Sequence, residues 1–91
     1  MDQGKYVFKL FISGMSVKSV RALENFNAIA SAYLYGKHEV EIIDVAKDRH
    51  KAAEYQIFAV PALLKLTPAP RRTILGDLSE TDKVLKLLDL E

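Results

Sequence analysis

The stretch Phe58-Ala59-Val60-Pro61-Ala62-Leu63-Leu64 places a proline near the start of an apolar run. A short, continuous apolar run of this kind is typical of a buried β-strand. Proline has no N–H to donate to a sheet ladder, so a strand tolerates it only at its first residue, at an edge or at a bulge. The sequence therefore predicts a strand over residues 59–67 that the chain enters through Val60-Pro61.

Before this stretch, the spacing of apolar residues predicts two strands joined by a long helix. Residues 6–12 and 38–45 are rich in β-branched and aromatic residues, which favour strands. Residues 17–35 carry apolar side chains at three-to-four spacing, which is the period of a helix with one buried face. Ser16 is a suitable N-cap for this helix and Gly36 a suitable end.

Three more elements follow from the same signals. Residues 48–55 predict a short helix that begins after an aspartate cap. The two prolines of the turn at 67–70, Thr-Pro-Ala-Pro, prevent this segment from forming a helix or pairing in a β-sheet. A short strand is predicted over 72–75, after this turn. Ser79 is expected to open a last helix that extends to residue 90, with an acidic residue three positions on as in a capping box.

The resulting order, β-α-β-α-β-β-α, decides the fold class. The first βαβ unit must be a right-handed parallel crossover, and the last two strands form an antiparallel hairpin. This is the thioredoxin-like α/β topology, with a four-stranded mixed sheet and helices on both faces, and we expect residues 1–91 to form one such domain. In that fold the proline at this place is a structural cis-proline, here Pro61, and the bend exposes the backbone of Val60.

Composition excludes several classes of function. The chain has 91 residues, a net charge of +1 and no cysteine. Without cysteine there is no disulfide, no thiol catalysis and no cysteine-based zinc site, and His38 and His50 lack the spacing of metal ligands. The balanced charge argues against binding to nucleic acid or a membrane surface, and no apolar run approaches the ~20 residues of a membrane span. We expect a cytoplasmic protein without a cofactor.

Few residues could carry chemistry. Ser16 is the only candidate nucleophile at the first helix, no base is evident beside it, and a helix cap is the favoured interpretation. Asp44, inside an apolar run, is expected to cap a turn or pair with a cation rather than to act as a perturbed acid. Arg71 and Arg72 could bind a carboxylate or phosphate through paired hydrogen bonds, although arginines in loops are usually exposed to solvent without a partner. These residues make no catalytic constellation, so we predict that the protein is not an enzyme.

Several segments, taken together, resemble the KaiB family. The similarity runs from about Tyr6 to Leu90, and Gly-Asp-Leu-Ser after an arginine-bearing strand is its most specific part. It also covers the sensory domain of the clock-output kinase SasA. The matching segments are Leu10-Phe11-Ile12-Ser13-Gly14, Ser19-Val20-Arg21-Ala22-Leu23, Ile43-Asp44-Val45, Ala59-Val60-Pro61-Ala62-Leu63, Arg72, Ile74-Leu75-Gly76-Asp77-Leu78-Ser79 and Lys83-Val84-Leu85.

The resemblance implies a function. KaiB is a circadian-clock protein and not an enzyme; it binds the hexameric ATPase KaiC and captures KaiA on that ring. We therefore expect a regulatory binding module with a KaiC-type ATPase as partner, in clock-like or stress signalling, and KaiA-like or histidine-kinase proteins as further partners. The partner-binding residues implied in this sequence are Arg21, Lys9, Glu39 and Glu41. Gly4 and Glu41 stand where cyanobacterial clock proteins commonly carry basic residues, which puts a timekeeping role in doubt.

KaiB is also metamorphic, which implies a second arrangement for this chain. In the alternative ground-state fold the first βαβ unit is kept, the second half is rearranged, and the chains assemble as tetramers. The residues implied in switching are Arg72, Gly76, Asp77, Ser79, Leu87 and Asp89. Leu87 stands where many relatives carry glycine, and this exchange favours a continuous last helix and hence the thioredoxin-like state. A homodimer or homotetramer remains open.

Two other functions also remain open. A small-molecule binder of the glutathione-transferase kind would use the backbone at Val60, before Pro61, to bind a glutathione peptide, and Ser79 at a helix N-terminus to hold its carboxylate. A general signalling adaptor would use the same surfaces with a different partner.

Overall fold

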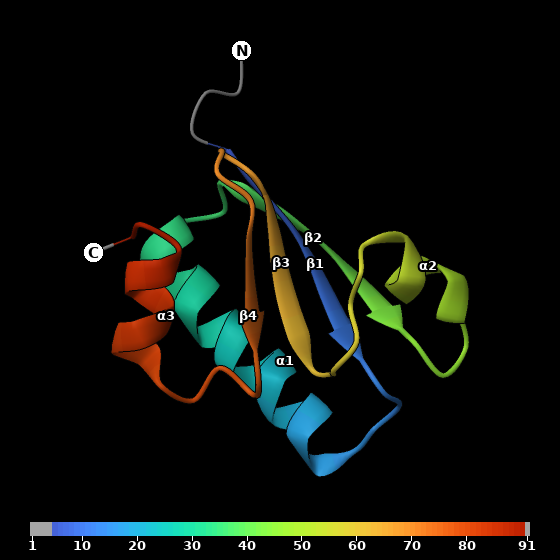
Figure 1. The fold of residues 1–91 in the computed structure, drawn as a ribbon. Helices are drawn as coiled ribbons and strands as arrows, with labels where there is room; N and C mark the ends of the chain where they lie inside the picture. Colours follow the sequence, from blue (N-terminus) through green and yellow to red (C-terminus); the bar gives the residue numbers. More distant parts are fainter. Residues whose placement is uncertain (1–4, 91) are drawn as a thin grey trace.

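The computed structural model describes residues 5–90. It contains one four-stranded sheet in the order β2-β1-β3-β4, in which β1 and β2 are parallel and the other two pairs are antiparallel. Figure 1 shows the central strands β1 and β3 between the two outer ones. The elements are β1 (Tyr6–Ile12), α1 (Val17–Ile29), the π-helix η1 (Ala30–Leu34), β2 (His38–Asp44), α2 (Arg49–Glu54), β3 (Ala62–Thr67), β4 (Arg72–Leu75) and α3 (Thr81–Leu87).

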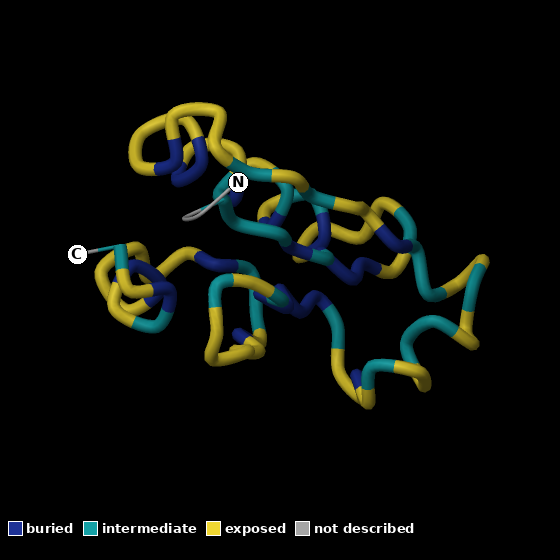
Figure 2. Tube along the Cα trace, turned by 90° about the horizontal axis from the view of Figure 1, so that it is seen from above, coloured by how far each residue is buried: buried dark blue, intermediate teal, exposed yellow. Residues whose placement is uncertain are grey.

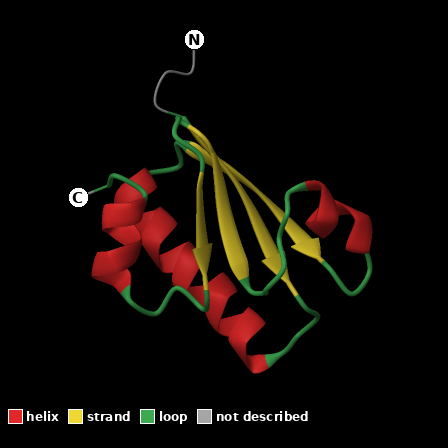
Figure 3. Ribbon diagram, in the orientation of Figure 1, coloured by secondary structure: helices red, strands yellow, loops and turns green. Residues whose placement is uncertain are grey.

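Helices cover the two faces of the sheet unequally. Along β1 the side chains alternate, so that Phe8 and Leu10 face the longer helices α1 and α3, while Phe11 faces α2. Figure 3 shows α1 and α3 together on one side of the strands and α2 apart from them. The main hydrophobic core lies between the sheet and the α1–α3 layer, and a smaller cluster lies under α2. In Figure 2 the buried stretches lie inside the fold and the exposed ones along its periphery.

The thioredoxin-like topology predicted from the sequence is confirmed, including the strand that was predicted at 72–75. Residues 71–90, which distinguish the two arrangements, form β4 followed by α3, as the thioredoxin-like state requires. The proline pair in the preceding turn bounds β4 on one side, and Gly76, at a φ of 104°, ends it on the other. The Val60–Pro61 peptide bond is cis, as are Thr67–Pro68 and Ala69–Pro70.

Several predicted boundaries are wrong. The third strand begins at Ala62 and not at residue 59, because the chain reaches the sheet only after Pro61; Phe58, predicted to be buried, is 90% exposed. The long helix predicted over 17–35 is helical to Leu34, but it is α-helical only to Ile29 and continues as the π-helix η1, in which Tyr33 is exposed. The second strand ends one residue before the predicted 45.

The last helix also begins later than predicted. α3 starts at Thr81, its N-cap position is Glu80, and no side chain caps it, so the expected capping box at Ser79 does not form. Within the described residues, no helix has the length and apolar character needed to cross a membrane. Gly4, one of the departures noted above, lies outside the described residues.

Candidate functional site

Hydroxyl groups fix the turn that leads into α1. The Ser16 Oγ accepts a hydrogen bond from the Ser19 N–H at 3.2 Å, which confirms Ser16 as the N-cap. The Ser16 hydroxyl also donates to the Ser19 Oγ at 2.9 Å, and that oxygen accepts from the Ser13 N–H at 3.0 Å. Ser19 is fully buried, a role that its place in a polar stretch of sequence did not reveal. These bonds hold the hydroxyls in a structural network rather than beside a base.

Asp44 ties the end of β2 to the same turn. Its Oδ1 accepts hydrogen bonds from the N–H groups of Gly14 and Ala46, both at 3.0 Å. These two bonds hold the pKa of the Asp44 carboxyl below its ordinary value, with a smaller contribution from the charge of Lys47. The prediction that Asp44 caps a turn is therefore confirmed.

A ladder of opposite charges runs along β1 and β2 on the α2 face. The parallel register pairs Lys9 with Glu41, and their side chains form an ion pair. Lys51 of α2 reaches the other oxygen of Glu41 at 2.8 Å, and Lys5 pairs with Glu39 at 2.6 Å. Hydrogen bonds from Lys51 and Lys9 lower the pKa of Glu41 to about 2, and Lys5 lowers the pKa of Glu39. We call these five residues the β2 charge ladder.

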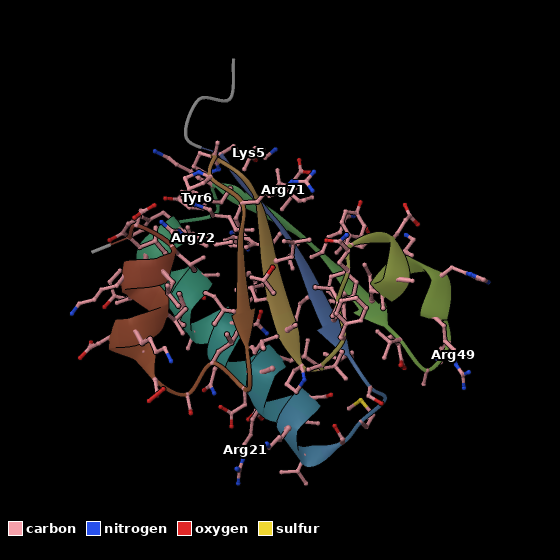
Figure 4. The ribbon with its side chains drawn as sticks, in the orientation of Figure 1. Lys5, Tyr6, Arg21, Arg49, Arg71 and Arg72 are labelled. Carbon is pink, nitrogen blue, oxygen red and sulfur yellow. The ribbon has the colours of Figure 1, made fainter. Side chains whose placement is uncertain are left out.

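Only three of the four predicted partner-binding residues come together. Lys9, Glu39 and Glu41 belong to the β2 charge ladder, where Lys9 also lies 5.4 Å from the centre of the Tyr55 ring. Arg21 lies on α1, against the opposite face of the sheet, and Figure 4 shows its guanidinium extending into solvent. A partner that contacts both Arg21 and the β2 charge ladder must therefore reach residues on both faces of the sheet.

Asp77 organises the loop between β4 and α3. Its Oδ1 accepts from the Ser79 N–H at 3.1 Å, and its C=O accepts from the Asn25 Nδ2 at 2.8 Å. The pKa of Asp77 is lowered by the hydrogen bonds from Ser79, and further by the positive charges of Arg21 and Lys18. Because the Ser79 N–H is already bonded to Asp77 and Ser79 does not begin α3, the expected carboxylate site at Ser79 is not formed.

A buried lysine, which sequence reasoning missed, lies where the sheet meets the end of α3. Lys65 is 1% exposed; its Nζ lies 3.9 Å from the Asp89 carboxylate and 5.8 Å from the centre of the Tyr6 ring. The Tyr6 hydroxyl donates to the Leu88 C=O at 3.3 Å, and burial, followed by the negative charge of Asp89, raises the pKa of Tyr6. The signal was available in the period-two alternation of β3, which puts Lys65 on the same face as the core residue Leu63.

The other residues implied in fold switching line the same half of the molecule. Arg72 is exposed and pairs across the ladder with Lys65, and Leu87 packs partly buried against the main core. The buried Pro61 accepts a hydrogen bond at its C=O from the Gly76 N–H at 2.9 Å. These contacts join the β3–β4 hairpin to the sheet and to α3.

Arg71 immediately precedes β4 and Arg72 is its first residue, and both side chains are exposed (Figure 4). No ion pair joins either guanidinium to another residue within 5–90. Over the same residues, no group of three or more histidine or acidic side chains is arranged to hold a metal ion. His50 is exposed.

Comparisons with a protein-family profile and with individual proteins both match this chain to KaiB. The profile of the KaiB domain matches residues 9–90. The chain is 41% identical over 90 residues to the circadian clock protein KaiB3 of Synechocystis sp., covering 99% of this chain and 88% of that protein. It is 45% identical over 85 residues to the circadian clock oscillator protein KaiB of Cyanothece sp., covering 93% of this chain and 81% of that protein.

Solved structures match the fold. The N-terminal domain of SasA from Synechococcus elongatus has a TM-score of 0.75 and 21% identity, covering 94% of this chain and 85% of that chain. The thioredoxin of Fasciola hepatica has a TM-score of 0.74 and 16% identity, covering 99% and 85% of the two chains. These likenesses show the thioredoxin-like fold, and the family is shown by the KaiB domain match over nearly the whole chain together with identities above 40%. The chain belongs to the KaiB family.

Proposed function

We propose that this chain is a non-enzymatic regulatory module that acts in the cytoplasm by docking on a hexameric KaiC-type ATPase. The observation that carries the proposal is Arg21: it stands in the Ser-Val-Arg-Ala-Leu motif on α1, is exposed, and forms no ion pair with another described residue. A guanidinium presented in this way can form a charge-assisted pair with a carboxylate of a partner.

The β2 charge ladder suggests that this chain selects partners differently from the cyanobacterial clock proteins. Where cyanobacterial clock proteins commonly carry a basic residue, this chain has Glu41, which the ion pairs to Lys9 and Lys51 keep ionised. A partner that binds at the β2 edge therefore contacts carboxylates whose charge is already balanced by neighbouring lysines. We propose that KaiA-like or histidine-kinase partners, where they bind, are selected by this edge, and that the module serves clock-like or stress signalling.

The test is binding of the full chain to a purified KaiC-type hexamer from the same organism, measured by fluorescence anisotropy. Loss of one partner from a buried charge pair costs ~2–5 kcal/mol, so Arg21→Ala should weaken binding at least about tenfold. Arg49→Ala is the matched control, because Arg49 is also exposed and has no ion pair in the described residues, but lies at the start of α2. Its affinity should stay within about twofold of the parent, and circular dichroism should be unchanged in both variants.

Two results would contradict the proposal in different ways. Equal affinities for the two variants would show that α1 is not the docking surface. No binding of the parent chain to any KaiC-type hexamer would refute the partner and favour an adaptor with another target. Saturable binding of glutathione, with a shift of the Val60 amide resonance, would instead favour the small-molecule alternative.

A further inference from the structure

The loop between β4 and α3 is held against α1 by a side chain of that helix. Asn25 donates from its Nδ2 to the Asp77 C=O at 2.8 Å. Asn25 lies one helical turn after Arg21, and helix side chains lean toward the N-terminus, so this bond holds the loop beside the turn that carries Arg21. Lys18 lies on the same stripe of α1, three residues before Arg21. We call these four residues the α1–loop surface.

The carboxylate of Asp77 is fixed on this surface and ionised. Its Oδ1 accepts a hydrogen bond from the Ser79 N–H at 3.1 Å, and the residue is partly exposed. The hydrogen bonds from Ser79, followed by the charges of Arg21 and Lys18, keep the pKa of Asp77 below its ordinary value. Within residues 5–90, no lysine or arginine forms an ion pair with it. The surface therefore presents a fixed negative charge beside two positive ones.

This arrangement of charges restricts what can bind. A carboxylate that pairs with Arg21 also comes close to Asp77, because the two side chains share one surface. Like charges that face each other across an interface are strongly disfavoured, and opposite charges favour the correct partner and its register. A wholly acidic partner is therefore a poor match, whereas a partner with a cation beside its carboxylate matches both signs.

We propose that Asp77 is a specificity-determining residue of the docking surface, and that the partner places a lysine or arginine against it, next to the carboxylate that pairs with Arg21. The partner is then a protein surface with charges of both signs, and Asp77 rejects a purely acidic segment. The inference rests on the proposed function, since it requires that Arg21 contacts the partner, and it adds a second contact of opposite sign.

Asp77→Asn tests the charge while keeping the shape. The amide oxygen can still accept from the Ser79 N–H, and the backbone C=O still accepts from Asn25. The affinity for the KaiC-type hexamer, measured by fluorescence anisotropy, should fall at least about fivefold. The affinity for poly-L-glutamate should rise at least about threefold, because one repelling charge is removed. A loss of fold would instead lower both affinities.

Two control variants separate charge from structure. Glu54→Gln makes the same charge change at an exposed position of α2, against the other face of the sheet. In about 0.1 M salt, which screens distant charges, both of its affinities should stay within about 1.5-fold of the parent. Asn25→Ala removes the bond between α1 and the loop but leaves every charge in place, so it should not raise the affinity for poly-L-glutamate.

The outcomes separate this inference from the proposed function. If Arg21→Ala weakens binding to the hexamer but Asp77→Asn leaves it unchanged or tightens it, docking through α1 stands and the inference is overturned. If the parent chain does not bind the hexamer, or Arg21→Ala has no effect, the proposed function is wrong and the inference fails with it. Equal affinities of the parent and Asp77→Asn for poly-L-glutamate would also overturn the inference, because Asp77 would then not act against a bound carboxylate.

Discussion

Replacing Leu87 by glycine tests how α3 is held against the core. Leu87 is the last residue of α3, and its partly buried side chain packs against the main core. Glycine in place of leucine costs ~0.8 kcal/mol in helix propensity, and losing a half-buried leucine side chain costs about 1–2 kcal/mol. The free energy of unfolding should therefore fall by about 2–3 kcal/mol, a large share of the stability of a domain of this size.

The assay is urea unfolding followed by circular dichroism, with Lys86→Gly as the control. Lys86 is the neighbouring position in the same turn and is exposed, so its glycine variant loses helix propensity without core packing and should cost ~1 kcal/mol or less. Equal losses in the two variants would refute the argument that packing of Leu87 holds α3 in place. NMR chemical shifts over 81–87 give the second readout: a loss of helix in Leu87→Gly alone, without global unfolding, is the expected sign of fold switching.

Three further predictions concern individual side chains. The Glu41 carboxyl should titrate near pH 2 by NMR, and a pKa near 4.5 would contradict the β2 charge ladder. Because this pKa is lowered from 4.5, the stability that Glu41 contributes above pH 4.5 should be lost as the pH falls from 4.5 toward 2. Glu41→Gln should remove this part of the acid unfolding transition. Tyr6 has a raised pKa, so its contribution to stability should be complete below pH 10 and disappear as the pH rises further; Tyr6→Phe should show less alkaline loss in a pH series of thermal melts. Ser16→Ala should cost ~1 kcal/mol in urea unfolding and Ser16→Gly only a few tenths, and equal costs for the two would argue against the cap.

The sequence predicted helices and strands well where a proline, a glycine or a capping residue marks their ends. β4 was placed correctly because a proline turn precedes it and Gly76 follows it. Ser16 and Asp48 were predicted as N-caps from residue preference, and each accepts a hydrogen bond from the N–H three residues on, a contact that depends only on nearby sequence.

Features that depend on distant parts of the chain were not predicted. The pairing of Lys9 with Glu41 follows from the register of β1 against β2, and the contact of Lys65 with Asp89 from the place where the end of α3 meets β3. The exposure of Phe58 was missed because an apolar run gives no sign of where the chain joins the sheet. The separation of Arg21 from the β2 charge ladder has the same origin, since motif similarity does not say which face of a sheet a residue occupies.

The thin cover on the α2 face has a consequence for hydrogen exchange. None of the residues of α2 is buried, and the hydrophobic cluster beneath it is smaller than the main core, so detaching this helix should require less free energy than unfolding the sheet. Amide protons of α2 should therefore exchange with solvent through local opening, while those of the central strands β1 and β3 exchange only when the whole domain unfolds. We therefore expect two units of different cooperativity within this single chain.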